Sequence, residues 1–178
     1  MSQIGEIKKL SDTRFLNFYE FEAVHRDGTS APYFVASRAK KIEQLKAISR
    51  ENKPDGVILF GVYGEKKDRV VLARQYRYPL GDYVYEFPAG LVASGEDMVA
   101  AGIREMYEET GLTFTPVDAG ACSRPFFTTI GMTDESCGTV FGYCSGAWFA
   151  ERPETRRSEL QGRADVRGYE EKRVGHHG

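Results

Sequence analysis

Residues 90–112 read GLVASGEDMVAAGIREMYEETGL, and this stretch decides the fold of the chain. Residues 95–110 have the spacing of an amphipathic helix, with four side chains on one face: Val99, Ile103, Met106 and Thr110. Three glutamates share the opposite side: Glu105, Glu108 and Glu109. Like charges at these spacings cost roughly a few tenths of a kcal/mol per pair in an isolated helix. The cluster is therefore either a solvated acidic face or a site for a divalent cation, which prefers carboxylate oxygens.

Capping residues stand at both ends of this predicted helix. Ser94 is a suitable N-cap, and Asp97 three residues later resembles the second half of a capping box. Glu96 and Asp97 also suit the positive N-terminal end of the helix dipole. Gly111 can adopt the left-handed conformation that ends a helix. We therefore expect a helix bounded by Ser94 and Gly111.

The whole stretch resembles the Nudix box, in which glycine, glutamate, arginine and aliphatic positions recur at fixed spacing. The matching positions are Gly90, Glu96, Arg104, Glu105, Met106, Glu108, Glu109, Gly111 and Leu112. Seven fixed identities give a chance match on the order of 10⁻⁸ per start position. The resemblance implies an α+β chain with the Nudix fold, a mixed β-sheet in an α/β/α sandwich, and the binding of Mg²⁺ or Mn²⁺.

Roles for single residues follow from the same resemblance. The metal ligands of the family carry over onto the backbone carbonyl of Ala89 and onto Glu105, Glu108 and Glu109, with Glu108 acting directly or through water. Arg104 corresponds to the residue that orients the glutamates. Glu96 is expected to fix the loop or to support the ligands from behind them.

The flanking residues 74–90, RQYRYPLGDYVYEFPAG, are similar to the branch of the family that cleaves ADP-ribose and ADP-sugars. Arg77 matches an arginine that contacts substrate phosphate, and its fork of donors suits bidentate phosphate binding. Glu86 matches a glutamate near the metal site. The alternatives are a surface arginine and an outward-facing glutamate on ordinary strands.

Residues 32–38, PYFVASR, fall where this branch has a segment that contacts substrate, often donated by the partner subunit of a dimer. Tyr33 or Phe34 would then stack on adenine, and Arg38 would reach a phosphate. The alternative for the two aromatic residues is ordinary packing of a sheet.

Two segments depart from the branch. The loop 128–136, TTIGMTDES, has Ile130 where the branch often has proline. The acidic loop and the last helix of the branch are not recognisable after residue 146. For the general base we therefore consider Glu135 first, together with a carboxylate of the last region, with Glu108 as the remaining choice. The carboxylates of that region are Glu151, Glu154 and Glu159.

The resemblance implies metal-dependent hydrolysis of the pyrophosphate bond in a nucleoside diphosphate sugar, with ADP-ribose giving AMP and ribose 5-phosphate. Two alternatives stay open. One is a domain that binds nucleotide sugars without cleaving them, and the other is a pyrophosphatase for a GDP- or UDP-sugar.

Composition limits the other classes of function. The 178 residues carry a formal net charge of −2, so a general nucleic-acid binder is not expected. No apolar run approaches the ~18 residues of a membrane span, and we expect no membrane association. The N-terminus has no apolar signal segment, and the three cysteines form no CxxC pair, which is typical of reduced thiols in a cytoplasmic protein.

Three regions are expected along the chain. Residues 1–52 form a β-hairpin and a short helix, which the branch resemblance makes a dimerisation region and the chain a homodimer. Residues 53–146 form the Nudix catalytic core, and 147–178 form an irregular segment. The pattern predicts six or seven strands, among them 13–24, 32–37, 56–64, 69–78, 83–90 and 137–146, with a first helix over 39–50.

Overall fold

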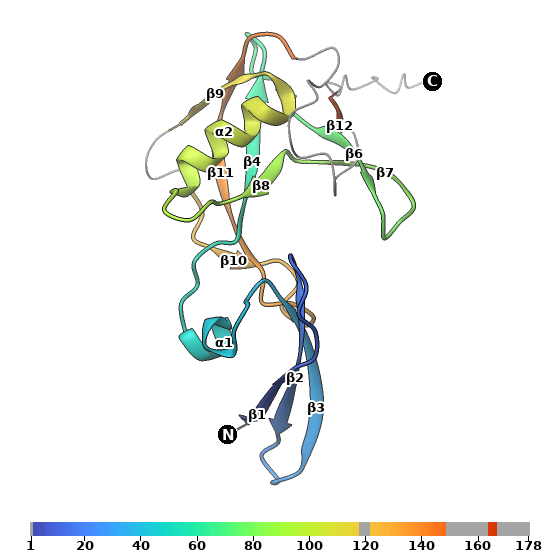
Figure 1. Cartoon of the computed structure of the whole chain (residues 1–178). Helices are drawn as coiled ribbons and strands as arrows, with labels where there is room; N and C mark the ends of the chain where they lie inside the picture. The colour runs from blue at the N-terminus through green and yellow to red at the C-terminus, as the bar shows by residue number, and fades with distance from the viewer. Residues whose placement is uncertain (1, 118–121, 149–163, 167–178) are drawn as a thin grey trace, which may run out of the picture. The chain divides into compact units, whose positions relative to one another are not determined.

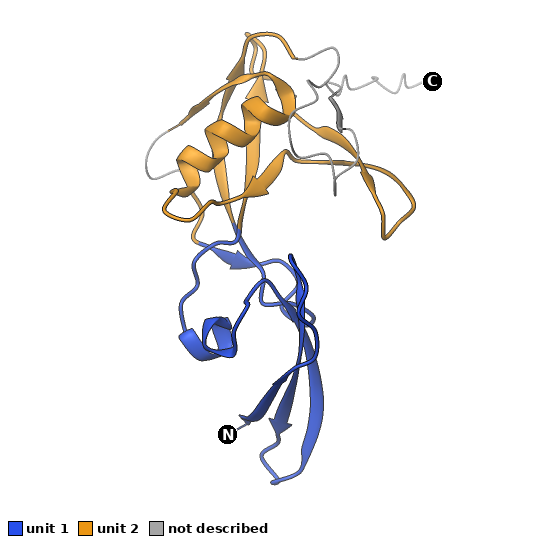
Figure 2. Cartoon of the chain, viewed as in Figure 1, with its two compact units in different colours: residues 1–55, 125–137 blue, residues 56–124, 138–178 orange. Residues whose placement is uncertain are grey.

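The computed structural model describes residues 2–117, 122–148 and 164–166 of the chain (Figure 1). It contains two compact units, coloured separately in Figure 2. Unit 1 comprises Met1–Asp55 and Pro125–Cys137, and unit 2 comprises Gly56–Arg124 and Gly138–Gly178. The described residues form twelve strands, more than the sequence pattern predicts, because several are only two or three residues long.

Unit 1 holds a three-stranded antiparallel sheet in the order β1-β2-β3. Its strands are β1 (Gln3–Lys9), β2 (Asn17–Val24) and β3 (Ser30–Ser37). The hairpin of β2 and β3 confirms the predicted strands 13–24 and 32–37, and Asp27-Gly28 between them is a typical hairpin turn. Strand β1 was not predicted, because its sequence QIGEIKK has few β-branched residues and a glycine.

The single helix predicted over 39–50 is wrong. The structure has a 3₁₀ turn η1 (Ile42–Gln44) and a one-turn helix α1 (Lys46–Ser49), which Arg50 ends in the left-handed conformation. Leu45 lies between them with ψ near 136°, which breaks the helical hydrogen bonding. Its side chain is fully buried against the sheet of unit 1, so burial of this leucine overrides the helical periodicity.

A second small pairing completes unit 1. Strand β10 (Phe126–Phe127) pairs with the first residues of β11 (Ser136–Ser145), where Phe127 faces Ser136. Met132 lies in the loop between β10 and β11, and its carbonyl accepts a hydrogen bond from the amide of Ala36 on β3 over 2.9 Å. The loop before β11 is therefore held against the sheet of unit 1.

Unit 2 is built around a sheet in which β11 lies beside β4 (Gly56–Tyr63). Strand β4 also pairs antiparallel with β5 (Arg69–Val70) and β8 (Ala89–Leu91), and β11 pairs antiparallel with β9 (Thr113–Pro116). Strand β4 is nearly continuous in apolar residues, as expected for a strand covered on both faces. This sheet carries the residues that support the glutamate helix.

Two predicted strands are each divided in the structure. The stretch 69–78 forms β5 and β6 (Ala73–Arg77), and 83–90 forms β7 (Asp82–Glu86) and β8. The first break falls at Val71, whose amide donates to Gly61 over 2.9 Å and whose side chain is buried. The second follows from Pro88, which cannot donate to a ladder. Strands β6 and β7 form a hairpin that is extended by β12 (Ala164–Val166).

Helix α2 (Met98–Thr110) confirms the central helix, with two corrections. Its N-cap is Asp97, not Ser94, because the Asp97 carboxylate accepts hydrogen bonds from the amides of Val99 and Ala100. Gly111 ends it with φ near 79°, as expected. The buried face also differs: Ile103 is exposed, whereas the buried residues are Ala101, Gly102, Glu105, Met106, Glu109 and Thr110.

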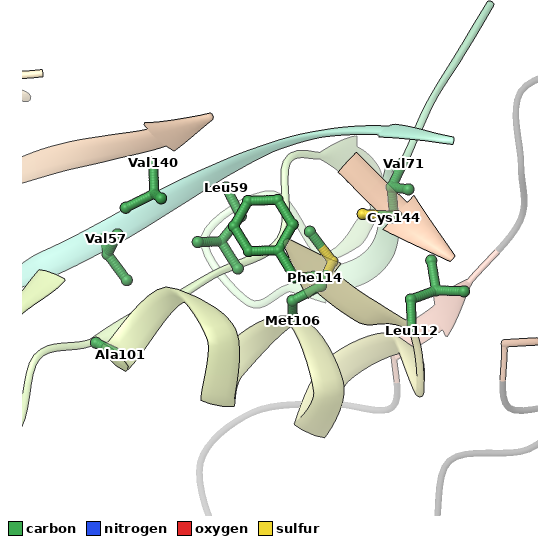
Figure 3. Packing of buried hydrophobic residues seen from close by; sticks show 9 residues of the cluster. All are labelled: Val57, Leu59, Val71, Ala101, Met106, Leu112, Phe114, Val140 and Cys144. Carbon is green, nitrogen blue, oxygen red and sulfur yellow. The ribbon is translucent and has the colours of Figure 1, made fainter. Parts of the chain in front are cut away.

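The core of unit 2 lies between α2 and the sheet that contains β4 and β11 (Figure 3). Its buried side chains are Val57, Leu59, Val71, Ala101, Met106, Leu112, Phe114, Val140 and Cys144. Burial of such residues supplies most of the driving force for folding, at roughly 1.5–3 kcal/mol for each large side chain. Since Met106 packs into this core, the glutamates on the same helix are held at fixed positions.

Candidate active site

Arg104 lies at the centre of an acidic group in unit 2. Its Nε and Nη2 atoms donate to the two carboxylate oxygens of Glu96 over 2.9 and 2.8 Å, and Nη1 donates to Glu105 Oε1 over 2.7 Å. Nη1 also lies 3.5 Å from Glu108 Oε2. The hydrogen bonds to Glu96 raise the pKa of Arg104 above its usual value, burial lowers it, and Glu105 raises it further. Arg104 is therefore a permanent cation facing three carboxylates.

Main-chain groups of the preceding loop fix this arrangement. Arg104 Nη2 also donates to the carbonyl of Leu91 over 3.1 Å, and the amide of Ala93 donates to Glu96 Oε2 over 3.0 Å. Glu96 thus bridges the loop and Arg104, in the position that the sequence suggested for it. The partners Leu91 and Ala93 were missed, because a main-chain contact leaves no signal in side-chain identity.

Glu105 and Glu109 are buried, with 0% and 5% of their surface exposed. Glu109 Oε2 accepts a hydrogen bond from the amide of Ala89 over 3.1 Å. A Cβ atom at Gly90 would lie 1.9 Å from the Glu105 carboxyl carbon, so any other residue there would displace that carboxylate from its present position. The glycine and the two glutamates of the motif therefore form one packed unit.

The donor set suits a divalent cation of the Mg²⁺ type, which takes carboxylate and carbonyl oxygens. Arg104 faces three carboxylates, those of Glu96, Glu105 and Glu108, which together carry more negative charge than one guanidinium neutralises. A divalent cation would offset this excess of negative charge. In the described parts of the chain, however, no three histidine, cysteine, aspartate or glutamate side chains are gathered as a metal site. Glu108 in particular is directed to Arg104 and is 41% exposed.

Arg77 and Glu86 face each other across the β6–β7 hairpin of unit 2. Arg77 Nη2 donates to Glu86 Oε1 over 2.6 Å and Arg77 Nε donates to Oε2 over 3.1 Å, a bidentate ion pair. The structure thus brings together two residues that the sequence analysis proposed separately. The Arg77 guanidinium, which was predicted to bind a phosphate, binds the Glu86 carboxylate in this structure.

In unit 1, Arg38 and Glu135 also form an ion pair. Both Nε and Nη2 of Arg38 donate to Glu135 Oε1, over 2.9 and 2.7 Å. The hydroxyl of Tyr33 donates to the carbonyl of Gly131 over 2.8 Å, which ties the same loop to β3. Three predicted site residues therefore share one part of unit 1. Glu151, Glu154 and Glu159, the other candidates for the base, lie outside the described residues.

Comparison with known proteins agrees with this geometry. The fold and the arginine-centred group define a Nudix-type domain, and the family description "NUDIX domain" matches residues 52–163. The chain belongs to the Nudix family. This confirms the resemblance derived from residues 90–112.

Individual relatives match parts of the chain. The ADP-sugar pyrophosphatase of Mus musculus is 52% identical over 42 residues, which cover 24% of this chain and 19% of that protein. The ADP-ribose pyrophosphatase of Bacillus subtilis (strain 168) is 35% identical over 95 residues, 51% of this chain and 47% of that protein. The chain thus spans less than half the length of these curated relatives.

A solved structure described as "Crystal structure of ADP compounds hydrolase" has a TM-score of 0.62 to this chain at 16% identity. The match covers 94% of this chain and 77% of that one. At this identity the likeness establishes the fold alone, and it confirms the predicted fold class. Within the part of the chain that the structure describes, no helix is long and apolar enough to cross a membrane.

Proposed function

We propose that this chain hydrolyses the pyrophosphate bond of a nucleoside diphosphate sugar in a reaction that requires a divalent cation, with ADP-ribose as the favoured substrate. The observation that carries the proposal is the packed unit of Gly90, Arg104, Glu105 and Glu109. Burying two carboxylates is costly unless they are hydrogen-bonded and paired with positive charge. An acidic cluster kept only for solubility would lie in water instead.

The residues that would hold Mg²⁺ or Mn²⁺ are Glu105, Glu109 and Glu108, with the carbonyl of Ala89. A bound divalent cation supplies charge neutralisation at the diphosphate and lowers the pKa of a water molecule. Arg104 holds Glu105 in place, and the Ala89 amide holds Glu109. These contacts fix the carboxylates before substrate arrives, so little reorganisation is needed during the reaction.

Substrate contacts are proposed for Arg77, Glu86, Arg38 and Tyr33. For Arg77 to bind a phosphate, its guanidinium must share or exchange the Glu86 carboxylate. Carboxylate and phosphate oxygens both accept paired hydrogen bonds from its planar fork. The preference for ADP-ribose is supported by the names of the partial relatives, ADP-sugar pyrophosphatase and ADP-ribose pyrophosphatase. The products would be AMP and ribose 5-phosphate.

The proton of the attacking water must pass to a base. Glu135 is the first candidate, and its carboxylate would have to be available beside Arg38. Glu108 and the carboxylates of 151–159 remain the other candidates. Replacing each with glutamine and comparing the pH dependence of turnover would identify the base by loss of the acidic limb of the profile.

The central experiment is an assay of AMP released from ADP-ribose with and without Mg²⁺. We expect release only with the cation. Glu109→Gln should reduce release by at least about 100-fold, because losing a ligand costs no less than losing a group that orients one. Glu65→Gln, at an exposed turn position, is the matched control and should leave turnover unchanged. Full Mg²⁺-dependent turnover in Glu109→Gln would show that Glu109 is no ligand.

A second candidate function is binding of a nucleotide sugar without cleavage. The ion pair of Glu135 with Arg38 favours it, because that carboxylate is already engaged by a guanidinium and is not open to an attacking water. Calorimetric titration with ADP-ribose, run beside the AMP assay, separates the two functions: binding without AMP indicates the second. The same assay with GDP- and UDP-sugars tests the choice of substrate.

A further inference from the structure

A hollow of about 410 Å³ lies in unit 1, and none of its lining residues belongs to the Arg104 group. Its walls are mainly apolar and include Ile4, Phe21, Val35, Ala47, Phe127 and Ile130. Sites for small molecules have a similar character, with apolar walls, a few polar groups and a volume of roughly 300 to 1,000 Å³. The hollow, which we call the unit-1 hollow, is therefore large enough for one small molecule.

Three charged residues line the unit-1 hollow: Lys46, Asp134 and Arg50. The Lys46 ammonium is already bound, since it lies 2.5 Å from both Asp55 Oδ2 and Ser136 Oγ. Asp134 Oδ2 accepts the amide of Lys46 over 3.3 Å. The Lys46 ammonium and the Asp134 carboxylate therefore both contact other groups of unit 1.

Arg50 differs from these two residues. It is exposed at the end of α1, and none of the ion pairs within the described residues involves its guanidinium. An unengaged guanidinium beside apolar walls offers charge-assisted hydrogen bonds to an anionic group whose body enters the hollow. Arg50 is thus the lining residue that favours an anionic group on the ligand.

We propose that the unit-1 hollow binds a small molecule with an apolar or aromatic body and one anionic group, held by Arg50. The body replaces water against Phe21, Val35 and Phe127, which supplies most of the affinity. The anionic group fixes the orientation through Arg50. The lining also includes Tyr33, one of the proposed substrate contacts, so competition with ADP-ribose tests whether the hollow is separate from the nucleotide-sugar site. Binding in the hollow does not depend on the proposed hydrolysis.

The probe for this test is 1-anilinonaphthalene-8-sulfonate, whose aromatic body and sulfonate have the required chemistry and whose fluorescence rises in apolar surroundings. We expect saturable binding of one dye per chain. The neutral analogue N-phenyl-1-naphthylamine, which lacks the sulfonate, should bind more weakly.

Two variants test whether the dye binds in the hollow. Arg50→Asn should weaken binding by roughly tenfold, the effect of losing one hydrogen bond to a charged group. Asparagine suits this position because Arg50 has φ near 59°. Ala47→Phe should abolish binding by filling the hollow. Arg26→Asn, at an exposed position in the turn between β2 and β3, is the matched control and should bind as the wild type does.

Thermal unfolding of each variant shows that it is folded before its affinity is compared. Equal affinity in the wild type, Arg50→Asn and Ala47→Phe would mean that the dye binds elsewhere, and would overturn the proposal. Competitive displacement of the dye by ADP-ribose would overturn it as a separate site. Loss of dye binding as the protein concentration rises would show that a second copy fills the hollow, which also contradicts it.

Discussion

At the scale of single residues, the space beside Gly90 is filled by the carboxylate of Glu105. Replacing Gly90 with alanine would place a methyl group 1.9 Å from the Glu105 carboxyl carbon, and the neighbouring atoms would have to move. We expect Gly90→Ala to cost about 1–3 kcal/mol in unfolding free energy, as overpacking does. We also expect a fall in turnover of at least about tenfold, because Glu105 would lose its place beside Arg104.

Gly131→Ala is the matched control for this prediction, since a Cβ atom there would meet no atom within 4 Å. Chemical denaturation and the AMP assay measure both variants. A Gly90→Ala protein with wild-type stability and turnover would mean that Glu105 adapts freely, contrary to the packed unit described above.

The buried thiol of Cys144 gives a prediction about pH. Burial raises the pKa of Cys144 to about 11, above the value near 9.0 expected for an exposed thiol. Between these pH values the unfolded chain loses the proton while the folded chain keeps it. The protonated thiol therefore makes its full contribution to the free energy of unfolding below pH ~9. This contribution is lost as the pH rises toward 11.

Cys144→Ala removes this linkage. We expect its unfolding free energy to fall less between pH 8.5 and 11 than that of the wild type, by about 2–3 kcal/mol for a shift of this size. Urea denaturation at several pH values measures the difference. An identical slope in the two proteins would show that Cys144 ionises as easily in the folded chain as in the unfolded one.

At the scale of elements, α1 is only one turn long and depends on a side-chain network for its position. Lys46 Nζ contacts Asp55 Oδ2 and Ser136 Oγ, each at 2.5 Å, and the amide of Ser136 donates to the same Asp55 oxygen over 2.9 Å. Lys46→Met would leave the partly buried Asp55 carboxylate without this cation. We expect a loss of about 3 kcal/mol in unfolding free energy.

Lys53→Met is the control for the α1 network. The Lys53 ammonium forms a pair with Glu51, but both side chains are largely exposed, and exposed pairs contribute only about 0–1 kcal/mol. Denaturant titration of the two variants tests the contrast. Equal losses would contradict a special role for the Lys46 network in holding α1.

Helix α2 shows which features of an element can be predicted from the sequence. Its existence and its end at Gly111 follow from local residues, because periodicity and a left-handed cap depend on the chain nearby. Its buried face was predicted incorrectly at Ile103, because burial of Glu105 and Glu109 depends on Ala89, Gly90 and Arg104. Hydrophobicity alone places glutamates in water, and only the motif indicated otherwise.

At the scale of the whole molecule, the family was predictable from residues 90–112, whereas the pairing of distant residues was not. Arg38 and Glu135 are 97 residues apart in the chain, and Lys46 and Ser136 are 90 apart. No local periodicity relates such residues. The sequence proposed Arg38 and Glu135 for separate tasks, and their ion pair emerges only from the tertiary structure.

The predicted homodimer belongs to this scale as well. The first support is the branch resemblance, and the second is a pair of exposed phenylalanines on the sheet of unit 1. Phe18 and Phe34 stack with ring centroids 5.7 Å apart, although 44% and 47% of their surfaces are exposed. Exposed aromatic residues on a strand face are typical of interaction surfaces.

We therefore expect light scattering after size exclusion to give twice the 20.0 kDa mass of one chain. The double variant Phe18→Thr, Phe34→Thr should shift the mass toward the monomer, because threonine keeps strand propensity but removes the stacked apolar surface. Phe15→Thr, which removes an exposed phenylalanine before β2, should leave the mass unchanged. A wild-type monomer at all concentrations would refute the dimer, and an unchanged dimer in the double variant would place its interface away from this stack.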